Sequence, residues 1–267
     1  MACGRGPRAD DGSIVGGGGQ GRRRVLRSRP MRQFSYVLMV AVALTIIDPQ
    51  AQEDYPHAFP REGVTKLVDN DRVNVWEVNW ITGAKQPIHR HRHDMAGVYL
   101  RYGPITVTRP DGTANPPSAP FEIPRPYFQA KDVTHREEAL NPPGTAERLA
   151  IMVDLKYEPG AALPTLTADS KMSKSFPRTG AKNVLENDRV RMWDFTWERG
   201  RPVVQHLHDT DTIEVFLEGG VIASTTNEGK TMQHTVAWKS ARFVPRGTVD
   251  TEVATSGSPR AVIIELK

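Results

Sequence analysis

The chain contains two copies of one unit, and this internal repeat constrains the fold more than any other feature of the sequence. Residues 64–103 align without a gap with residues 181–220, at a constant offset of 117 positions. The segment Asn-Asp-Arg-Val occurs at 70–73 and recurs at 187–190. Because each copy specifies the same local structure, the repeat predicts two similar folded units in tandem. The tryptophans align as Trp76 with Trp193 and Trp80 with Trp197.

The alignment resumes near the end of each copy and defines the expected domains. The later matches are His135 with Asp250, Glu137 with Glu252, and residues 150–156 with residues 261–267. Between the copies, residues 157–180 are rich in Pro, Ser, Thr and Lys, a composition typical of linkers. We therefore expect a leader at 1–52, a first domain at 53–156, a linker at 157–180 and a second domain at 181–267.

Both copies are predicted to form β-strands. Residues 73–80 and 190–197 are rich in β-branched and aromatic side chains, and further short apolar runs follow between Gly, Pro, Asn and Asp turns. This pattern predicts an all-β sandwich or barrel. Residues 109–126 hold six prolines, which excludes a central strand. We expect a long loop there, either covering a barrel mouth or forming an edge segment or dimer arm.

Residues 1–52 are predicted to be a basic leader. They hold eight arginines and three aspartates, so the rest of the chain is close to neutral although the whole chain carries +4. The body therefore gives no electrostatic indication of nucleic-acid binding. Arginines, an apolar run at 34–47 and small and polar residues up to Ala51 predict a signal peptide and a periplasmic or secreted location. A membrane anchor, or a start at Met31, stays open as an alternative.

A His-x-His pair occurs at the same point of each copy. His89 and His91 follow Gly83 at the same distance as His206 and His208 follow Gly200. In a strand, residues i and i+2 point to the same face, so each pair can direct two imidazoles into one cavity. This arrangement is a common way to hold a metal ion.

These motifs resemble those of the cupin family. Glycine, five residues, His-x-His and a later glycine is similar to the first cupin motif, and it occurs in both copies. The second motif centres on Pro-x-Gly, two residues and His. The segment 245–247 matches Pro-x-Gly but is followed by Asp250, whereas His135 matches the histidine but follows Ala-Lys-Asp at 130–132. The chain resembles a secreted bicupin over residues 64–267, which implies two tandem jelly-roll-like β-barrels.

The resemblance also implies one divalent metal in each barrel mouth. The implied ligands are His89, His91 and His135 in the first unit, and His206, His208 and Asp250 in the second. Imidazoles suit Fe, Mn, Zn, Ni or Cu, and two histidines with one carboxylate suit non-haem iron. Alternatively, the histidines are polar residues at a barrel rim or on outer strand faces, and Asp250 caps a turn.

The chain departs from the cupin pattern at the consensus glutamate. Its position would be occupied by Met95 or Ala96 in the first unit and by Thr212 or Ile213 in the second. Glu214 lies one step further and would reach inward only if a bulge shifted the strand. Glu137 and Glu252 lie two residues beyond the third ligand position, on the same strand face. Glu137 is thus a candidate catalytic base, unless both glutamates are exposed charges.

Two kinds of function fit this pattern. The first is an enzyme that binds a small organic acid or enolate on the metal of the first domain, with dioxygenase-like or lyase-like chemistry. The second is a non-catalytic bicupin that binds or senses a ligand. The expected partner is a small molecule in either case, with membrane contact only through the signal segment and with a homodimer left open.

Overall fold

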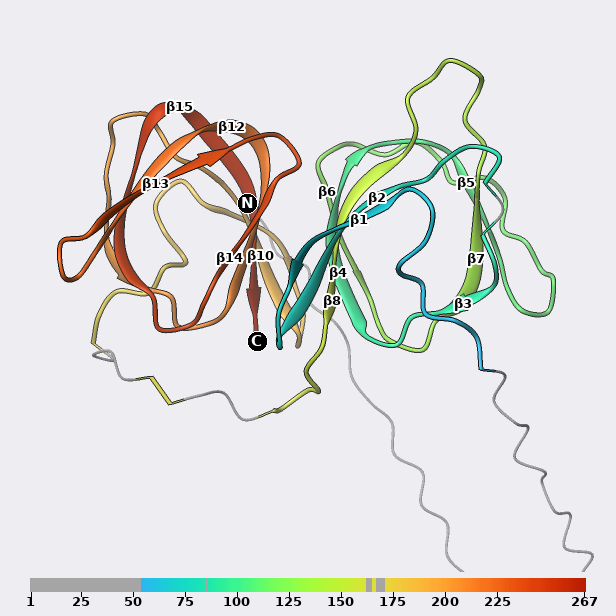
Figure 1. The fold of residues 1–267 in the computed structure, drawn as a ribbon, viewed down its shortest axis with the longest axis horizontal. Helices are drawn as coiled ribbons and strands as arrows, with labels where there is room; N and C mark the ends of the chain where they lie inside the picture. Colours follow the sequence, from blue (N-terminus) through green and yellow to red (C-terminus); the bar gives the residue numbers. More distant parts are fainter. Residues whose placement is uncertain (1–53, 85, 162–164, 167–170) are drawn as a thin grey trace, which may run out of the picture. The chain divides into compact units, whose positions relative to one another are not determined.

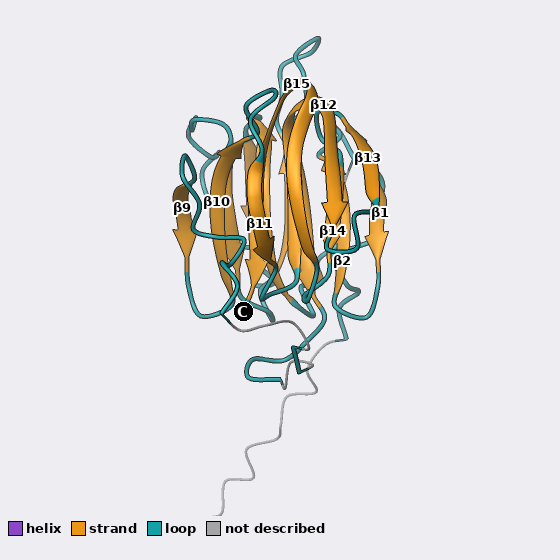
Figure 2. Ribbon diagram, turned by 90° about the vertical axis from the view of Figure 1, so that its left-hand side faces the viewer, coloured by secondary structure: helices purple, strands orange, loops and turns teal. Residues whose placement is uncertain are grey.

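The computed structural model describes residues 54–84, 86–161, 165–166 and 171–267. The predicted leader and signal segment lie outside these residues. Within the described chain the regular elements are all β-strands (Figure 2), so the all-β prediction is confirmed. None of the described residues belongs to a helix long and apolar enough to cross a membrane.

The first half of the described chain, coloured blue to yellow-green in Figure 1, forms two antiparallel sheets. One sheet has the order β1-β2-β8-β4-β6 and the other has the order β3-β7-β5. The strands are β1 (Val64–Asp69), β2 (Val73–Asn79), β3 (His89–Arg90), β4 (Asp94–Arg101), β5 (Ile105–Thr108), β6 (Arg125–Gln129), β7 (Thr134–Ala139) and β8 (Leu149–Leu155).

The second half repeats this arrangement with longer strands. The path is β13-β12-β15-β10-β9, with β11 paired to β15 and β14 paired to β12. The strands are β9 (Lys182–Glu186), β10 (Val190–Thr196), β11 (Val203–Leu207), β12 (Thr212–Thr226), β13 (Thr231–Val236), β14 (Ala241–Val244) and β15 (Val249–Leu266). Strand β12 runs through the positions that β4 and β5 occupy separately in the first half, and β15 does the same for β7 and β8.

Side-chain alternation along the strands builds separate cores. In β4, Ala96 and Val98 belong to a cluster that also contains residues of the second half, including Ile264. Their neighbours Met95 and Tyr99 point to the other face, into the interior core of the first half. A third cluster fills the interior of the second half. The two halves therefore share one apolar core between them and enclose one each.

Reciprocal ion pairs accompany the shared core. Arg72 donates from Nε to Asp211 at 2.7 Å, and Arg189 Nε lies 2.6 Å from Asp94 Oδ2. These residues are equivalent in the two copies, so each copy gives an arginine and an aspartate to the other. The ring of Tyr157 lies 3.9 Å from the guanidinium carbon of Arg72 and 4.6 Å from that of Arg189. The repeated Asn-Asp-Arg-Val segment therefore has a structural role at a two-fold-like contact.

The two segments expected to be irregular are anchored by aromatic side chains. Residues 109–124 form no strand, and Phe121 packs on Tyr99 and Tyr102 with ring centroids 5.4 and 5.2 Å apart. Within the segment expected as a linker, Phe176 is 2% exposed and stacks on Trp193 in the core of the second half. Part of that segment thus contributes to the second barrel.

The shared core predicts a large cost for truncation at its centre. Ile264 is fully buried in the cluster that joins the halves. Ile264→Ala should lower the free energy of unfolding by about 2–5 kcal/mol, because it removes apolar contacts and leaves a cavity. Denaturant unfolding measures this change. Val204→Ala, at a side chain that is 75% exposed, is the control and should change stability by less than about 0.5 kcal/mol. Equal effects of the two variants would contradict a shared core.

Candidate metal centre

Three histidines of the first half meet inside the barrel. His89 on β3 is the register partner of His135 on β7, and the pairing continues through a hydrogen bond from the His91 N–H to the Val133 carbonyl at 3.0 Å. Their ring centroids lie 4.9–5.2 Å apart, and each offers a nitrogen within 4.8 Å of the others. All three residues are buried. The alternative that they lie at a rim or on outer faces is wrong.

The imidazoles of this cluster present unused nitrogens to one another. His89 Nδ1 lies 3.1 Å from the Pro87 carbonyl, which leaves Nε2 as the acceptor nitrogen. His89 Nε2, His135 Nε2 and both nitrogens of His91 are buried without a hydrogen-bond partner in the described chain. Burial holds the pKa of His89 at about 4 and that of His91 at about 3, so both rings are neutral at pH 7. Converging neutral imidazoles with unused lone pairs fit a divalent transition metal.

Glu137 adds a carboxylate to this cluster. Its Oε2 lies 3.4 Å from His89 Nε2, and its Oε1 lies 3.4 Å from His135 Nε2. Arg61 donates to Oε2 at 2.8 Å. Burial alone would raise the pKa of Glu137, but Arg61 and the neighbouring His135 hold it well below its usual value. Glu137 is therefore a buried anion beside the three imidazoles, and the alternative of an exposed charge is wrong.

The turn before His135 forms without the glycine of the motif. Asp132 has a φ of 73°, and the equivalent Gly247 of the second half has a φ of 89°. Aspartate tolerates this left-handed region better than most residues do. Arg90 also donates from Nη2 to the Asp132 carboxylate at 2.6 Å. The departure from Pro-x-Gly at 130–132 thus keeps the turn that places His135.

The second half assembles the equivalent cluster from His206, His208 and Asp250. His206 on β11 is the register partner of Asp250 on β15. His206 Nε2 lies 3.3 Å from His208 Nε2 and 3.3 Å from Asp250 Oδ1, and all three residues are buried. Ser224 donates a hydrogen bond to the other oxygen of Asp250. Asp250 is therefore directed into the cluster rather than capping a turn, and the set is again able to hold a metal ion.

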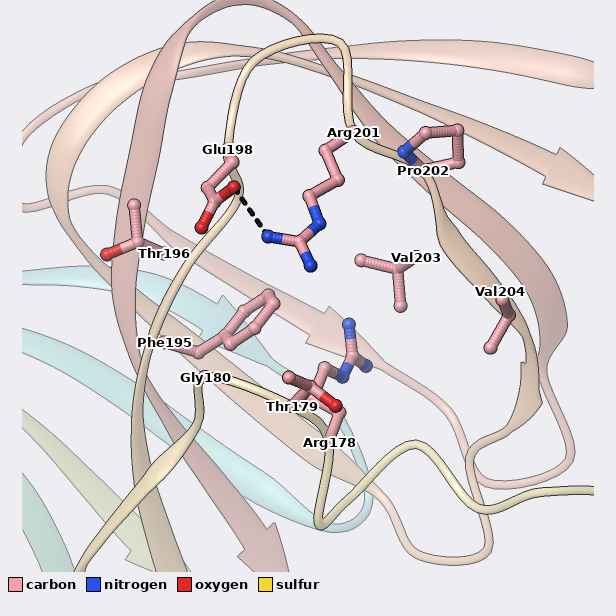
Figure 3. A pocket seen from close by; sticks show the side chains of 10 residues that line it. All are labelled: Arg178, Thr179, Gly180, Phe195, Thr196, Glu198, Arg201, Pro202, Val203 and Val204. Carbon is pink, nitrogen blue, oxygen red and sulfur yellow. Dashed lines mark hydrogen bonds and ion pairs between the residues drawn. The ribbon is translucent and has the colours of Figure 1, made fainter.

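An arginine side chain lies within hydrogen-bonding distance of a ring nitrogen of His206. His206 Nδ1 lies 2.9 Å from the Val204 carbonyl, so Nε2 is the acceptor nitrogen, and Arg178 Nη2 lies 3.2 Å from it. Arg178 also donates to Glu252 at 3.0 Å. Arg178 also lines a cavity of about 320 Å³, together with Phe195 and Val203 (Figure 3). The second cluster therefore differs from the first, where Arg61 donates to Glu137 and lies over the rings of Phe59 and Trp80.

A network of buried charges fills the second barrel beside this cluster. Arg242 donates to Glu214 at 2.6 Å and to Glu252 at 2.8 Å, and Trp197 donates to Glu252 at 3.0 Å. Glu214 is 2% exposed and lies in an unbroken stretch of the β12 register, so the expectation that it needs a bulge to face inward is wrong. Burial raises the pKa of Glu214. It binds Arg242 and is not part of the metal-capable cluster.

The first barrel holds a cavity where the second holds these charges. The cross-strand pair Glu214–Arg242 of the second half corresponds to Gly97–Tyr127 in the first. A cavity of about 210 Å³ adjoins the first histidine cluster, and its lining contains no residue of the irregular segment 109–124. Its lining residues are Phe59, Trp80, His91, Met95, Tyr99, Ile105, Val107, Tyr127, Gln129, His135, Glu137 and Met152.

Sequence reasoning missed the two arginines. The repeat extends further towards the N-terminus than residue 64, because Phe-Pro-Arg at 59–61 recurs as Phe-Pro-Arg at 176–178 with the same offset. Arg61 and Arg178 each bind the glutamate that lies two residues beyond the third ligand position. A longer alignment of the two copies would have found both residues.

His93 lies outside the first cluster. Its ring centroid is 5.7 Å from that of His57, and His57 Nε2 lies 3.2 Å from the buried carboxylate of Asp154. Trp76 donates to the same carboxylate oxygen at 2.8 Å. Phe59 contacts the rings of both His57 and His91. His93 therefore contacts His57 and is not part of the metal-capable group of His89, His91 and His135.

Comparison with known proteins supports the fold. No protein-family model matches the chain, and no curated protein matches its sequence. The crystal structure of AerE from Microcystis aeruginosa matches with a TM-score of 0.52 and 12% identity, over 80% of this chain and 98% of that one. Bacillus subtilis oxalate decarboxylase, studied for its Mn(II) centres, matches with a TM-score of 0.50 and 10% identity, over 79% and 78% of the chains. The chain has the two-barrel cupin fold, as the motifs predicted.

The buried histidines predict an acid-sensitive stability. In metal-free protein, His89 and His91 titrate near 6.5 when unfolded but near 4 and 3 when folded. The unfolded state therefore binds more protons between these values, and stability should fall as the pH is lowered from about 6.5 towards 4. His91→Gln should reduce the slope of unfolding free energy against pH by about 1.4 kcal/mol per pH unit in that window. Urea unfolding at several pH values in EDTA measures this slope. An unchanged slope in His91→Gln would contradict the lowered pKa of His91 in the folded protein.

Arg178 should weaken metal binding in the second half. Arg178→Met keeps an apolar stem but removes the N–H group that occupies His206 Nε2. In a His89→Ala/His91→Ala background, which leaves only the second cluster, we expect Zn²⁺ to bind at least about tenfold more tightly, which corresponds to about 1.4 kcal/mol. Calorimetric titration measures the affinity. Unchanged or weaker binding would show that Arg178 does not compete with the ion.

Proposed function

We propose that the first half binds a divalent transition metal through His89, His91 and His135 and uses it to bind and transform a small organic acid or enolate. The observation that carries this proposal is the set of buried imidazole nitrogens without partners beside an ionised Glu137 and an adjoining cavity. Three protein ligands leave coordination positions for a ligand, as catalytic metal sites require. The metal is one of Fe, Mn, Zn, Ni or Cu.

Electrostatics favour an anionic ligand in the first half. The negative charge of Glu137 is balanced by the positive charge of Arg61. A second arginine, Arg148, is 4% exposed and lies 4.6 Å from the ring of Tyr99, which lines the cavity. A divalent ion would therefore give this site a net positive charge, which attracts an acid or enolate. The second half holds three carboxylates beside its cluster but two arginines, so a divalent ion bound there would be more nearly neutralised. These groups are Glu214, Asp250, Glu252, Arg178 and Arg242. This difference favours the first half as the reacting site.

The residues of the chain have separable roles in this proposal. A metal held by His89, His91 and His135 would supply Lewis acidity, which would stabilise negative charge on an oxygen of the ligand. Glu137 is an anion within reach of the cluster and accepts a proton from the ligand or from water there. Arg61 holds this carboxylate in place and keeps it ionised. The surrounding apolar wall excludes water, which strengthens these interactions.

A non-catalytic bicupin that binds or senses the ligand is the second candidate. The consensus glutamate on β4 is replaced by Met95 or Ala96, and the ion pair with Arg61 lowers the basicity of Glu137. Both features reduce the means for proton transfer.

Metal analysis tests the shared basis of both candidates. The purified protein should hold a transition metal in the first half, and His89→Ala/His91→Ala should remove that ion, because two of its three ligands are lost. The matched pair His206→Ala/His208→Ala, at equivalent positions, should leave it in place. Elemental mass spectrometry measures the content. Absence of metal from the unmodified protein after supply of each candidate ion would refute the proposal.

Glu137→Gln separates the enzyme from the binding protein. The amide keeps the size of the side chain but does not accept a proton as a carboxylate does. For an enzyme we expect kcat to fall by about 10²–10⁴-fold, the usual contribution of proton transfer, with metal content retained. Turnover of a panel of small carboxylates and enols, followed by mass spectrometry, is the measurement. Retained metal and ligand binding without turnover in the unmodified protein would favour the binding role.

A further inference from the structure

The cavity beside the first histidine cluster has the size of one small ring. Its volume is about 210 Å³. An apolar protein cavity of roughly 150 Å³ holds a benzene molecule, whereas drug-sized ligands occupy about 300–1,000 Å³. The space therefore suits one six-membered ring with a few substituent atoms.

The wall of this cavity is mostly apolar. Aromatic and aliphatic side chains make up eight of its twelve lining residues if the two tyrosines are counted with them, and Phe59, Trp80 and Met152 are almost fully buried. A compact dianion such as oxalate would lose its hydration there with few polar groups to replace it. A flat ring would instead bury its faces against these side chains.

Two N–H donors of the wall have no partner. Trp80 Nε1 and Gln129 Nε2 are buried without a hydrogen bond in the part of the chain that the structure describes, and Trp80 is only 6% exposed. The Tyr127 hydroxyl donates to Gln129 Oε1 at 2.7 Å, so the amide N–H₂ group is the unused end. Unsatisfied buried donors are costly unless a bound molecule accepts from them.

The second half shows that these donors are not a general feature of the repeat. Trp197, the equivalent of Trp80, donates to Glu252 at 3.0 Å. Val244 stands at the β12–β14 register position that Gln129 occupies in the first half, so the amide has no counterpart. Among the described residues, the first copy is therefore the one in which a cavity lined by two of the clustered histidines also carries unpartnered tryptophan and glutamine N–H groups.

We propose that the first half recognises a single-ring molecule with an enol or phenol oxygen directed at the histidine cluster and an acceptor oxygen directed at Trp80 and Gln129. This inference rests on the proposed function, because the oxygen near the histidines is held by the metal. Trp80 and Gln129 are then specificity-determining residues. They distinguish a ring that carries the second oxygen from one that lacks it.

Three probes test this ligand class on Zn²⁺-loaded protein, since zinc has no redox chemistry. 3,4-Dihydroxybenzaldehyde carries two ring oxygens for the metal and an acceptor oxygen at the opposite end. Catechol lacks the acceptor, and oxalate lacks the ring. We expect the aldehyde to bind about tenfold more tightly than catechol, and catechol to bind more tightly than oxalate, by calorimetric titration.

Variants connect the preference to the two donors. Gln129→Leu and Trp80→Phe should each weaken binding of the aldehyde at least about fivefold more than they weaken binding of catechol, with zinc content unchanged. Gln205→Leu and Trp238→Phe are matched controls at exposed positions of the second half and should change neither affinity.

The outcomes separate failure of this inference from failure of the proposed function. Zinc bound at the first cluster, with oxalate preferred over both ring probes, would overturn the ligand class alone. Equal losses for the aldehyde and catechol in the variants would also overturn it, because the donors would then act only on cavity shape. No zinc at the first cluster would overturn both proposals together.

Discussion

The antiparallel pairing that sets each third ligand opposite a His-x-His pair is the interaction on which both clusters depend. His89 lies opposite His135, and His206 lies opposite Asp250. A shift of one residue in either register would turn these side chains to the opposite strand face. The pairing is supported by the turn before the third ligand, where Asp132 and Gly247 adopt the same left-handed conformation. The backbone thus defines each site before any ion is bound.

The two copies use one scaffold for different interiors. At one cross-strand position the first half has Gly97 and Tyr127, and the second has Glu214 and Arg242. In the second half Arg242 of this pair also donates to Glu252, which in turn accepts from Arg178. Arg178 lies within hydrogen-bonding distance of His206 Nε2, a nitrogen of the metal-capable cluster. Buried ion pairs of this kind must satisfy one another because each charge is costly alone. The cavity that adjoins the histidine cluster, and the unused N–H groups of Trp80 and Gln129 in its wall, are found in the first half.

The sequence predicted most of the fold and the composition of both clusters, for reasons that can be traced to particular residues. The repeat and the period-two strands gave the two barrels, and the spacing of His89 and His91 gave their common direction. The prediction for Glu214 was wrong because the face of its side chain was inferred from the consensus position of the glutamate. The pairing of β12 with β14 and β15 turns this side chain inward without a bulge. Arg61 and Arg178 were missed because their Phe-Pro-Arg segments lie before residues 64 and 181, outside the part of the repeat that predicted the domains.

What the sequence determined by itself was local and periodic: two all-β units, two histidine pairs on inward faces, and a carboxylate two residues beyond each third position. Only the tertiary structure decided how these parts are completed. It showed that Arg61 leaves the imidazole nitrogens of the first cluster open while Arg178 covers one in the second, and that Trp80 has no acceptor while Trp197 has one. The reason is physical, because such contacts join residues far apart in the chain and depend on packing, which no local pattern encodes.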